Sequence, residues 1–236
     1  MGTDETFDYD TSLNACYDNN GKDYFFKNVK SIFEADDLTI ANFEGTLTDS
    51  DEREDKEYAF KAPAEYTSIL TAGSVEAVNT ANNHSHDYGE KSYTDTISAL
   101  EDAGIASFGY NRIKILKIKG IKVGVTGIYE LADHQKRASQ VKQNIKALKK
   151  AGAQVIIVNF HWGIEKQYTP IIDFQYFYSH RITNRNNCCQ VQRLIVGVFT
   201  LCDDTVCFVS DIQDDLIWLY IDYSSLYDLS IVNSFK

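Results

Sequence analysis

The chain has 236 residues, a formal net charge of -11 and an isoelectric point near 4.9. This length allows one large domain or two small ones, with enough apolar side chains for a core. An acidic surface argues against nucleic acid and anionic membranes as main partners. The sequence contains no run of roughly 20 apolar residues, and its first residues lack the basic and apolar regions of a signal peptide. These features predict a soluble chain.

Apolar periodicity and the positions of Gly and Pro predict that strands and helices alternate along the chain. In chain order, the predicted elements are a helix over 23–35, a strand over 38–41, a charged loop over 49–57, a strand over 58–60, a helix over 64–72, a strand over 74–78, a helix from about 90 to 103, a strand over 105–108, a hairpin of strands 113–118 and 121–125, a helix over 136–151 and a strand over 155–160. This order predicts an α/β fold with a mixed sheet.

Three of these predicted elements have further distinguishing features. Ser92 and Asp95 have the spacing of a capping box, although the helix could begin slightly earlier. The strand over 155–160 is the most apolar of this half and is expected at the centre of its sheet. The helix over 136–151 is basic and amphipathic, and its charges are interpreted as a solvated face.

The composition changes after Pro170. Residues 171–236 contain no Ala and no Glu, whereas residues 1–170 use both heavily. We therefore predict one domain over 1–170 and a divergent segment over 171–236. That segment is either a second domain or a tail not selected with the rest, and its stretches 195–209 and 216–221 resemble strands.

Residues 79–89, NTANNHSHDYG, follow a predicted strand and precede a predicted helix. In α/β folds, the exits of strands usually carry the chemistry. Asn supplies a neutral oxygen ligand, and His can ligate a metal or deliver a proton near neutral pH. The alternative is a loop whose Asn and His side chains only bond to backbone groups. The density of polar groups here favours a site, with His86 and Asp87 as residues that could orient His84.

Two further strand exits carry polar residues. Asn42 and Glu44 are two residues apart and are expected to face the same side if the strand continues through them. His161 and Trp162 end the apolar strand over 155–160. The alternatives are a Glu44 in solvent and a His161 satisfied in the core. Three such strand ends, brought together by one sheet, would form a metal site of Asn, Glu and His.

The stretches DDLTIANFE over 36–44, ANNHSHDYG over 81–89 and FHWG over 160–163, with Glu165 and Pro170, resemble the CapA family. These capsule-synthesis proteins are associated with poly-γ-glutamate production. The resemblance covers about residues 2–170. It implies a metallophosphoesterase-like sandwich of mixed β-sheets flanked by helices, and a place in the cell envelope.

The resemblance also implies roles for individual residues. Asn83 matches a metal-ligating Asn, and His84 matches a phosphate-contacting His that donates a proton. Glu44, or less favourably Asn42, lies where a bridging acidic ligand is expected, and His161 matches the first ligand His of the later part. The substrate-binding residues predicted around them are Asn42, Asn82, His86, Asp87 and Trp162.

Two family motifs have no match here: a Gly-Asp motif on the first strand and a Gly-His-His-Pro-His stretch after the His-Trp-Gly motif. We therefore expect an incomplete member, truncated at both ends. The resemblance implies a hydrolase using Mn, Zn or Fe, whose metal could be lost with the missing ligands. The alternatives are a non-catalytic subunit, bound to a membrane capsule-synthase complex or an acidic polymer, and an inactive remnant.

Overall fold

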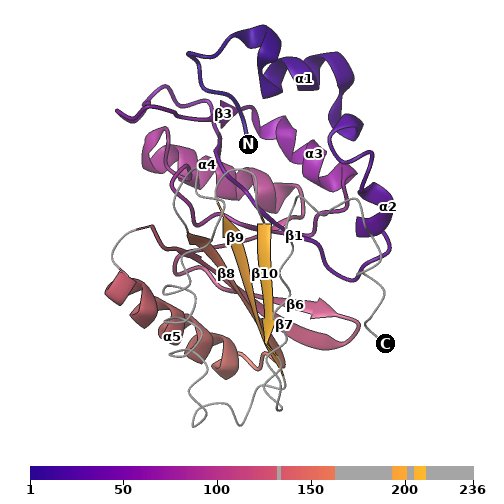
Figure 1. The fold of residues 1–236 in the computed structure, drawn as a ribbon, viewed down its shortest axis with the longest axis vertical. Coiled ribbons are helices and arrows are strands. Elements are labelled where there is room, and N and C mark those ends of the chain that lie inside the picture. The colour runs from indigo at the N-terminus through magenta and orange to yellow at the C-terminus, as the bar shows by residue number, and fades with distance from the viewer. Residues whose placement is uncertain (132–133, 163–192, 201–204, 211–236) are drawn as a thin grey trace. The chain divides into compact units, whose positions relative to one another are not determined.

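The computed structural model describes residues 1–131, 134–162, 193–200 and 205–210. These residues form two compact units. Unit 1 comprises Met1–Lys114 with Ile118–Gly120, and unit 2 comprises Ile115–Lys117 with the described residues from Ile121 onward. Figure 1 shows the elements of both units. The boundary predicted near residue 170 lies outside the described residues and stays a prediction.

Unit 1 is built on a three-stranded parallel sheet with the order β1-β4-β5. Its strands are β1 (Ile40–Asn42), β4 (Ala77–Asn79) and β5 (Ala106–Phe108), and a separate parallel pair joins β2 (Thr46–Leu47) to β3 (Lys61–Ala62). Its helices are α1 (Leu13–Asn20), α2 (Lys30–Phe33), α3 (Thr67–Ala72) and α4 (Gly89–Asp102), with 3-10 turns at Tyr9–Thr11, Lys22–Tyr24 and Ala64–Tyr66. The parallel strands separated by helices confirm the predicted α/β class.

The core of unit 1 lies between this sheet and its helices. It contains Phe43, Leu47, Ala62, Tyr66, Ile69, Leu70, Val75, Val78, Leu100 and Ile105. Gly73 is the C-cap of α3, which confirms the predicted stop. The ring of Phe26 packs so closely against Gly73 that a Cβ at this position would lie 2.4 Å from a ring carbon, which explains why glycine stands here.

The helix predicted over 23–35 is wrong for most of its length. The structure has a 3-10 turn at Lys22–Tyr24, irregular turns, and then only one helical turn at Lys30–Phe33. Phe25 and Phe26 both pack against the core. Neighbouring residues of an α-helix point about 100° apart, so irregular backbone lets both rings reach the core.

The predicted capping box is also not formed. Helix α4 begins at Gly89, which has a φ of +76°, and Ser92 lies inside its first turn. The Ser92 hydroxyl accepts a hydrogen bond from the backbone N–H of Tyr88 at 3.2 Å and donates to the carbonyl of Gly89 at 2.7 Å. Asp95 instead pairs with Lys91 at 2.6 Å. Ser92 thus caps the helix from inside its first turn.

The strand predicted over 58–60 lies a few residues later, at Lys61–Ala62. Two carboxylates explain the shift. The backbone N–H of Ala59 donates to Asp4 at 2.5 Å, and that of Phe60 donates to Asp87 at 2.6 Å. These N–H groups are thereby satisfied by side chains and take no part in a ladder.

A mixed five-stranded sheet has the order β10-β9-β8-β7-β6 and belongs to unit 2, apart from the two end residues of β6. The strands are β6 (Lys114–Ile118), β7 (Ile121–Tyr129), β8 (Val155–Trp162), β9 (Arg193–Thr200) and β10 (Thr205–Ser210). Strand β8 pairs in parallel with β7 and β9, which confirms its predicted central position. The stretch 195–209 falls on β9 and β10, which pair antiparallel, whereas 216–221 lies outside the described residues.

The predicted hairpin is confirmed by its turn. Lys119 and Gly120 join β6 to β7 with φ values of +48° and +87°, which is the pattern of a two-residue turn between twisted strands. Helix α5 (His134–Lys150) then packs against β7 and β8. Gly124 on β7 makes room for it, because a Cβ there would lie 2.9 Å from the side chain of Leu148.

Candidate functional site

The carboxyl ends of β1 and β4 bring the first two predicted motifs together. The two strands are parallel, with Asn42 opposite Asn79. The N–H of Phe43 then donates to the carbonyl of Asn79 at 2.8 Å, so the segments that follow β1 and β4 leave the sheet side by side. As a result, Nε2 of His84 lies 3.8 Å from Oε1 of Glu44.

Asn82 fixes the loop that carries His84. Its side chain is buried, and its amide nitrogen donates to the carbonyl of Phe43 at 2.7 Å. Its amide oxygen accepts from the backbone N–H of His84 at 3.0 Å. Both ends of the Asn82 side chain therefore tie the His84 loop to the residue before Glu44. Its predicted contact with substrate stays a prediction.

Asp87 orients the imidazole of His84. Their side chains meet at 2.8 Å through Nδ1 of His84 and Oδ2 of Asp87, and the Asp87 side chain is fully enclosed. This contact is the one expected if Asp87 orients His84, and that role stays a prediction. The ring of Phe60 lies 4.5 Å from the imidazole, centroid to centroid, and covers it. With Nδ1 bonded to the carboxylate, Nε2 is the nitrogen left to face Glu44.

Lys56 is a residue of this site that the sequence analysis missed. Its ammonium group donates to Oδ1 of Asp87 at 2.6 Å and to the carbonyl of Asn83 at 2.8 Å, and lies 3.5 Å from Nδ1 of His84. Asn83 itself is half-buried. Lys56 belongs to the loop that the sequence showed only as a run of charges, and no spacing marked it.

Glu44 combines a charge with partial enclosure. Burial raises the pKa of its carboxyl group, and the attraction of His84 opposes that rise. Oε2 accepts a hydrogen bond from the amide of Asn42 at 3.2 Å, which confirms that these two side chains share one side. Gly45, with a φ of +116°, turns the chain directly after it. A carboxylate held in this way gains from a nearby cation.

Tyr110 supports the opposite side of the His84 loop. It follows β5, the third strand of the sheet, and has a φ of +53°, which is rare for a bulky residue. Its hydroxyl group lies 2.6 Å from Oγ of Ser85 and donates to the carbonyl of Asn82 at 3.0 Å. His86 stacks on Tyr93, with the ring centroids 4.5 Å apart. The signal that could have found Tyr110 is its place at the end of a strand.

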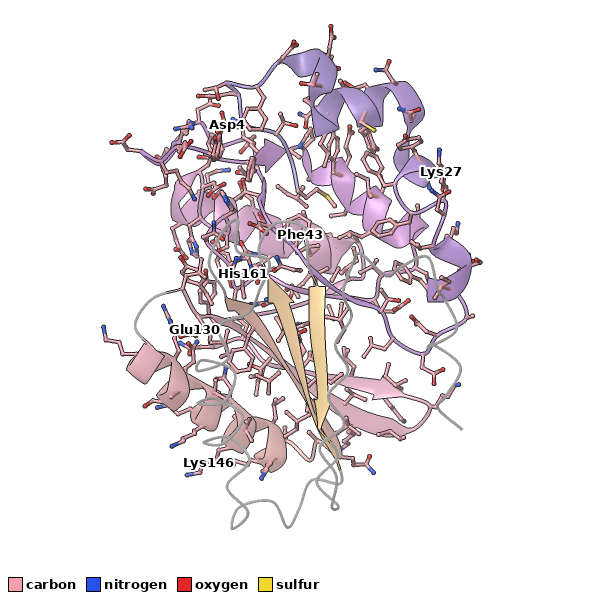
Figure 2. All side chains as sticks on the ribbon, viewed as in Figure 1. Asp4, Lys27, Phe43, Glu130, Lys146 and His161 are labelled. Atoms are coloured by element: carbon pink, nitrogen blue, oxygen red, sulfur yellow. The ribbon has the colours of Figure 1, made fainter. Side chains whose placement is uncertain are left out.

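His161 and Trp162 belong to unit 2. His161 is fully buried at the end of β8, opposite Tyr129 of β7, and its carbonyl accepts from the N–H of Glu130 at 2.8 Å. Figure 2 marks His161 and Glu130 in this unit. The side chain of Trp162, together with Glu165, Pro170 and His180, lies outside the described residues. Glu44, Asn83 and His84 thus come from unit 1, and His161 comes from unit 2.

Among the side chains that the structure describes, no group of three or more His, Cys, Asp and Glu residues is arranged to hold a metal ion. The contact between Glu44 and His84 supplies one carboxylate and one imidazole. The predicted metal site therefore stays a prediction.

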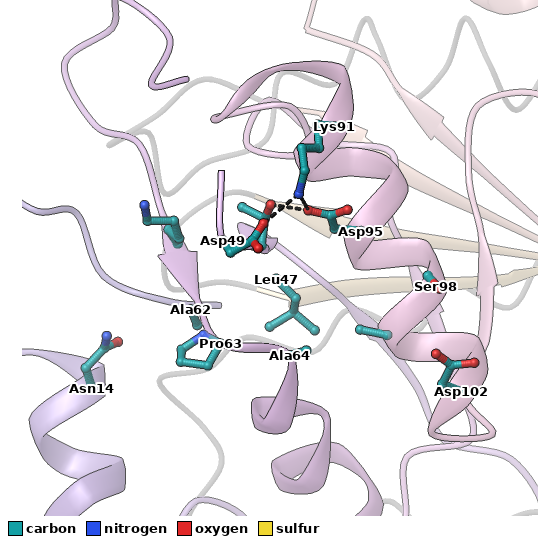
Figure 3. Close-up of a pocket in the computed structure, with 13 residues that line it drawn as sticks. Asn14, Leu47, Asp49, Ala62, Pro63, Ala64, Lys91, Asp95, Ser98 and Asp102 are labelled. Carbon is teal, nitrogen blue, oxygen red and sulfur yellow. Dashed lines mark hydrogen bonds and ion pairs between the residues drawn. The ribbon is translucent and has the colours of Figure 1, made fainter. Parts of the chain in front are cut away.

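A separate cleft of about 730 Å³ lies in unit 1 between α4 and the β2–β3 pair. Figure 3 shows Leu47, Ala62 and Pro63 along it, with Lys91 between Asp49 and Asp95 at one end. Lys91 contacts each of these carboxylates at 2.6 Å. None of the residues predicted for the site lines this cleft.

The family model for the bacterial capsule synthesis protein PGA_cap matches residues 7–185. The chain belongs to this family. The match contains the strand exits at Glu44, His84 and His161, so the predicted family is confirmed.

Two curated relatives agree with this assignment. The PGA biosynthesis protein CapA of Bacillus subtilis (strain 168) is 26% identical over 174 residues, which cover 64% of this chain and 45% of that protein. The capsule biosynthesis protein CapA of Bacillus anthracis is 28% identical over 176 residues, covering 64% and 43%. This PGA_cap chain therefore spans less than half the length of either relative.

The residues that the structure describes include no helix long and apolar enough to cross a bilayer.

Proposed function

We propose that this PGA_cap protein acts in the synthesis of a poly-γ-glutamate capsule at the cell envelope, and that Glu44, His84 and the residues around them form a hydrolytic site. The family match and the names of the two CapA relatives support the capsule role. The hydrolytic role is supported by one observation above all, the 2.8 Å contact between His84 and Asp87 that leaves Nε2 facing Glu44.

This arrangement suits general acid–base chemistry. Asp87 holds the imidazole in one orientation, with Nδ1 toward the Asp87 carboxylate and Nε2 toward Glu44. An oriented imidazole of this kind can donate a proton to a leaving group. Lys56 keeps Asp87 in place through a second contact, so the carboxylate cannot turn away. The chain thereby holds a proton donor at a fixed position beside Glu44.

We extend the proposal to a divalent metal ion bound beside Glu44. The Glu44 carboxylate is penalised by burial and would be relieved by a cation. Carboxylate and amide oxygens, the donors that Glu44 and Asn83 of unit 1 offer, are ligands for divalent ions such as Mn²⁺. When bound, such an ion polarises a phosphoryl or acyl group and lowers the pKa of water. We also propose that the fold is metallophosphoesterase-like and that the substrate is a phosphoester or an acyl compound.

A non-catalytic subunit that binds a capsule synthase or its polymer is the second candidate function. It is favoured by a different feature, the row of exposed lysines on α5. Such a subunit would keep its role when Glu44 and His84 are replaced. A hydrolase would not.

Turnover of a chromogenic phosphodiester and of a γ-glutamyl amide, each with added Mn²⁺, tests the proposal. We expect His84→Ala and Glu44→Gln to abolish a metal-dependent turnover that Asp102→Asn retains. Asp102 is an exposed acid in the separate cleft, so it is a matched control for loss of one carboxylate. Equal turnover in all four proteins, or turnover without any metal dependence, would overturn the hydrolytic role.

A further inference from the structure

Helix α5 concentrates positive charge on an acidic protein. Its 17 residues, HQKRASQVKQNIKALKK, contain six Lys and Arg and no Asp or Glu. The whole chain carries -11, so everything outside this helix carries -17. A charge of this sign and density is the kind of feature that attracts an anionic partner.

Three of these lysines form a single row on the exposed side of α5. Lys142, Lys146 and Lys150 are all exposed and follow one another at intervals of four residues. Four residues of α-helix rise about 6 Å, so the row spans about 12 Å. Figure 2 marks Lys146 on this helix.

The opposite side of α5 is fixed against the sheet. Val141 and Leu148 are fully buried, and the amide of Asn144 donates to the hydroxyl group of Thr126 on β7 at 2.8 Å. Because these contacts fix the rotation of the helix about its axis, they also fix the direction in which the lysine row of unit 2 faces.

The row is unfavourable for the helix itself. Like charges four residues apart repel each other and destabilise a helix. Within the described part of the chain, no ion pair forms at Lys142, Lys146 or Lys150, although acidic residues are abundant in the sequence. A partner that brings carboxylates would remove this repulsion.

We propose that the row of Lys142, Lys146 and Lys150 binds a flexible acidic polypeptide, a polyglutamate chain, along the axis of α5. In an extended α-linked peptide, alternate side chains lie on one side about 6.7 Å apart. That spacing is close to the rise of about 6 Å between lysines. The choice of this polymer rests on the proposed capsule role, and both α-linked and γ-linked polyglutamate carry the required carboxylates.

Two other anionic partners fit less well. A helix that binds a membrane surface inserts an apolar face, but the apolar face of α5 is already buried against β7 and β8. A membrane or a nucleic-acid duplex also presents a broad negative surface to the acidic remainder of the protein. A flexible chain can follow a row of three lysines and avoid that repulsion.

The test is binding of fluorescently labelled α-linked and γ-linked polyglutamate to the full chain, measured by anisotropy at low and physiological salt. We compare the wild type with the variant Lys142→Gln, Lys146→Gln and Lys150→Gln. Exposed ion pairs contribute factors of about 1.4 to 5 each, so losing three should weaken binding by between about threefold and about 100-fold. The chelator EDTA is present throughout, so the result does not depend on the proposed metal site.

The matched control removes three exposed lysines elsewhere, Lys22, Lys27 and Lys117, with the same change of charge. Control affinity should remain within about twofold of wild type, and a Lys→Arg triple variant in α5 should retain binding. Circular dichroism checks that every variant is folded. Better binding of one linkage identifies the polymer.

Equal weakening in the α5 variant and its control would overturn the proposal, as would no binding to either polymer. It would also be overturned by stronger binding to vesicles of anionic lipid or to duplex DNA. The hydrolytic role is judged separately by the Glu44 and His84 variants, so the two proposals can fail independently.

Discussion

His84 and Asp87 are joined by a 2.8 Å contact in which the carboxylate is fully enclosed. The same carboxylate also pairs with Lys56 at 2.6 Å and accepts from the N–H of Phe60 at 2.6 Å. Asp87 thus connects the loop before β3 to the loop after β4. Its position between them makes it a structural centre of the site and also the residue that orients His84.

Replacing Asp87 by Asn should destabilise the protein substantially. The change keeps the size of the side chain but removes the charge that Lys56 and His84 face. Breaking such an enclosed, hydrogen-bonded pair typically costs about 2–4 kcal/mol. Urea unfolding followed by circular dichroism measures the loss. Asp102→Asn, an exposed acid in the same unit, is the control, and similar losses in both variants would contradict this role.

Glu44→Gln should stabilise the protein at neutral pH. Burial raises the pKa of Glu44 in the folded state, so the charged form is penalised there. Below the ordinary glutamate pKa of about 4.3, Glu44 is neutral in the folded and unfolded states and costs no stability. As the pH rises through the folded-state pKa, the enclosed carboxyl group ionises and the free energy of unfolding falls. The variant has no such loss. Its melting temperature should exceed that of the wild type at pH 7, and the difference should shrink toward pH 4.

A wild type that melts higher than the Glu44 variant at pH 7 would contradict this prediction. It would mean that the charged carboxylate is better compensated than its enclosure indicates. The same scan on Asp102→Asn shows the background effect of losing one exposed charge.

Gly45→Ala should cost more than an ordinary glycine replacement. Its φ of +116° suits glycine, and a Cβ there would lie 2.1 Å from the carbonyl oxygen of Met1. Gly104 also has a positive φ, +77°, but nothing lies within 4 Å of its added Cβ. Strain alone should cost about 1–2 kcal/mol at Gly104, and the clash should add about 1–3 kcal/mol at Gly45. Equal losses of unfolding free energy in the two variants, measured by urea unfolding, would contradict this prediction. They would show that Met1 can move aside at little cost.

Asp4→Asn should reduce stability at neutral pH and flatten its acid dependence. Burial alone would raise the pKa of Asp4, but hydrogen bonds from Thr6, Ala59 and Arg53 outweigh it and hold the pKa well below its usual range. The stability from this group is present above about pH 4 and is lost as the pH falls toward the folded-state pKa. Losing its charged hydrogen bonds should cost about 2–3 kcal/mol at pH 7. Acid titration of both proteins by circular dichroism tests this, and a parallel acid transition in the variant would contradict it.

The parts of the fold that could be predicted depend on local patterns. Lys119 and Gly120 marked a tight turn because a two-residue hairpin requires positive φ values. The unbroken apolar run over 155–160 marked a strand buried on both faces. The approach of Glu44 to His84 also followed from a general rule, that parallel strands end at the same edge of a sheet.

The parts that could not be predicted depend on distant contacts. Lys56 reaches Asp87 across 31 positions of sequence, and Tyr110 reaches Asn82 across 28. A run of charges does not show which lysine turns inward. The failed helix over 23–35 has the same cause, because Phe25 and Phe26 are adjacent and both pack against the core, which a regular helix would not allow. Side-chain carboxylates likewise moved the strand predicted at 58–60.

The most direct test of the central claim is stoichiometric metal binding, measured by calorimetry with Mn²⁺ and Zn²⁺ on wild type, Glu44→Gln and Asp102→Asn. Glu44→Gln is chosen because it should fold at least as stably as the wild type, so a loss of binding cannot come from unfolding. The account predicts one or two ions per chain in the wild type and in Asp102→Asn, and a loss of at least about tenfold in affinity for Glu44→Gln. Unchanged binding in Glu44→Gln, or none in the wild type, would contradict it.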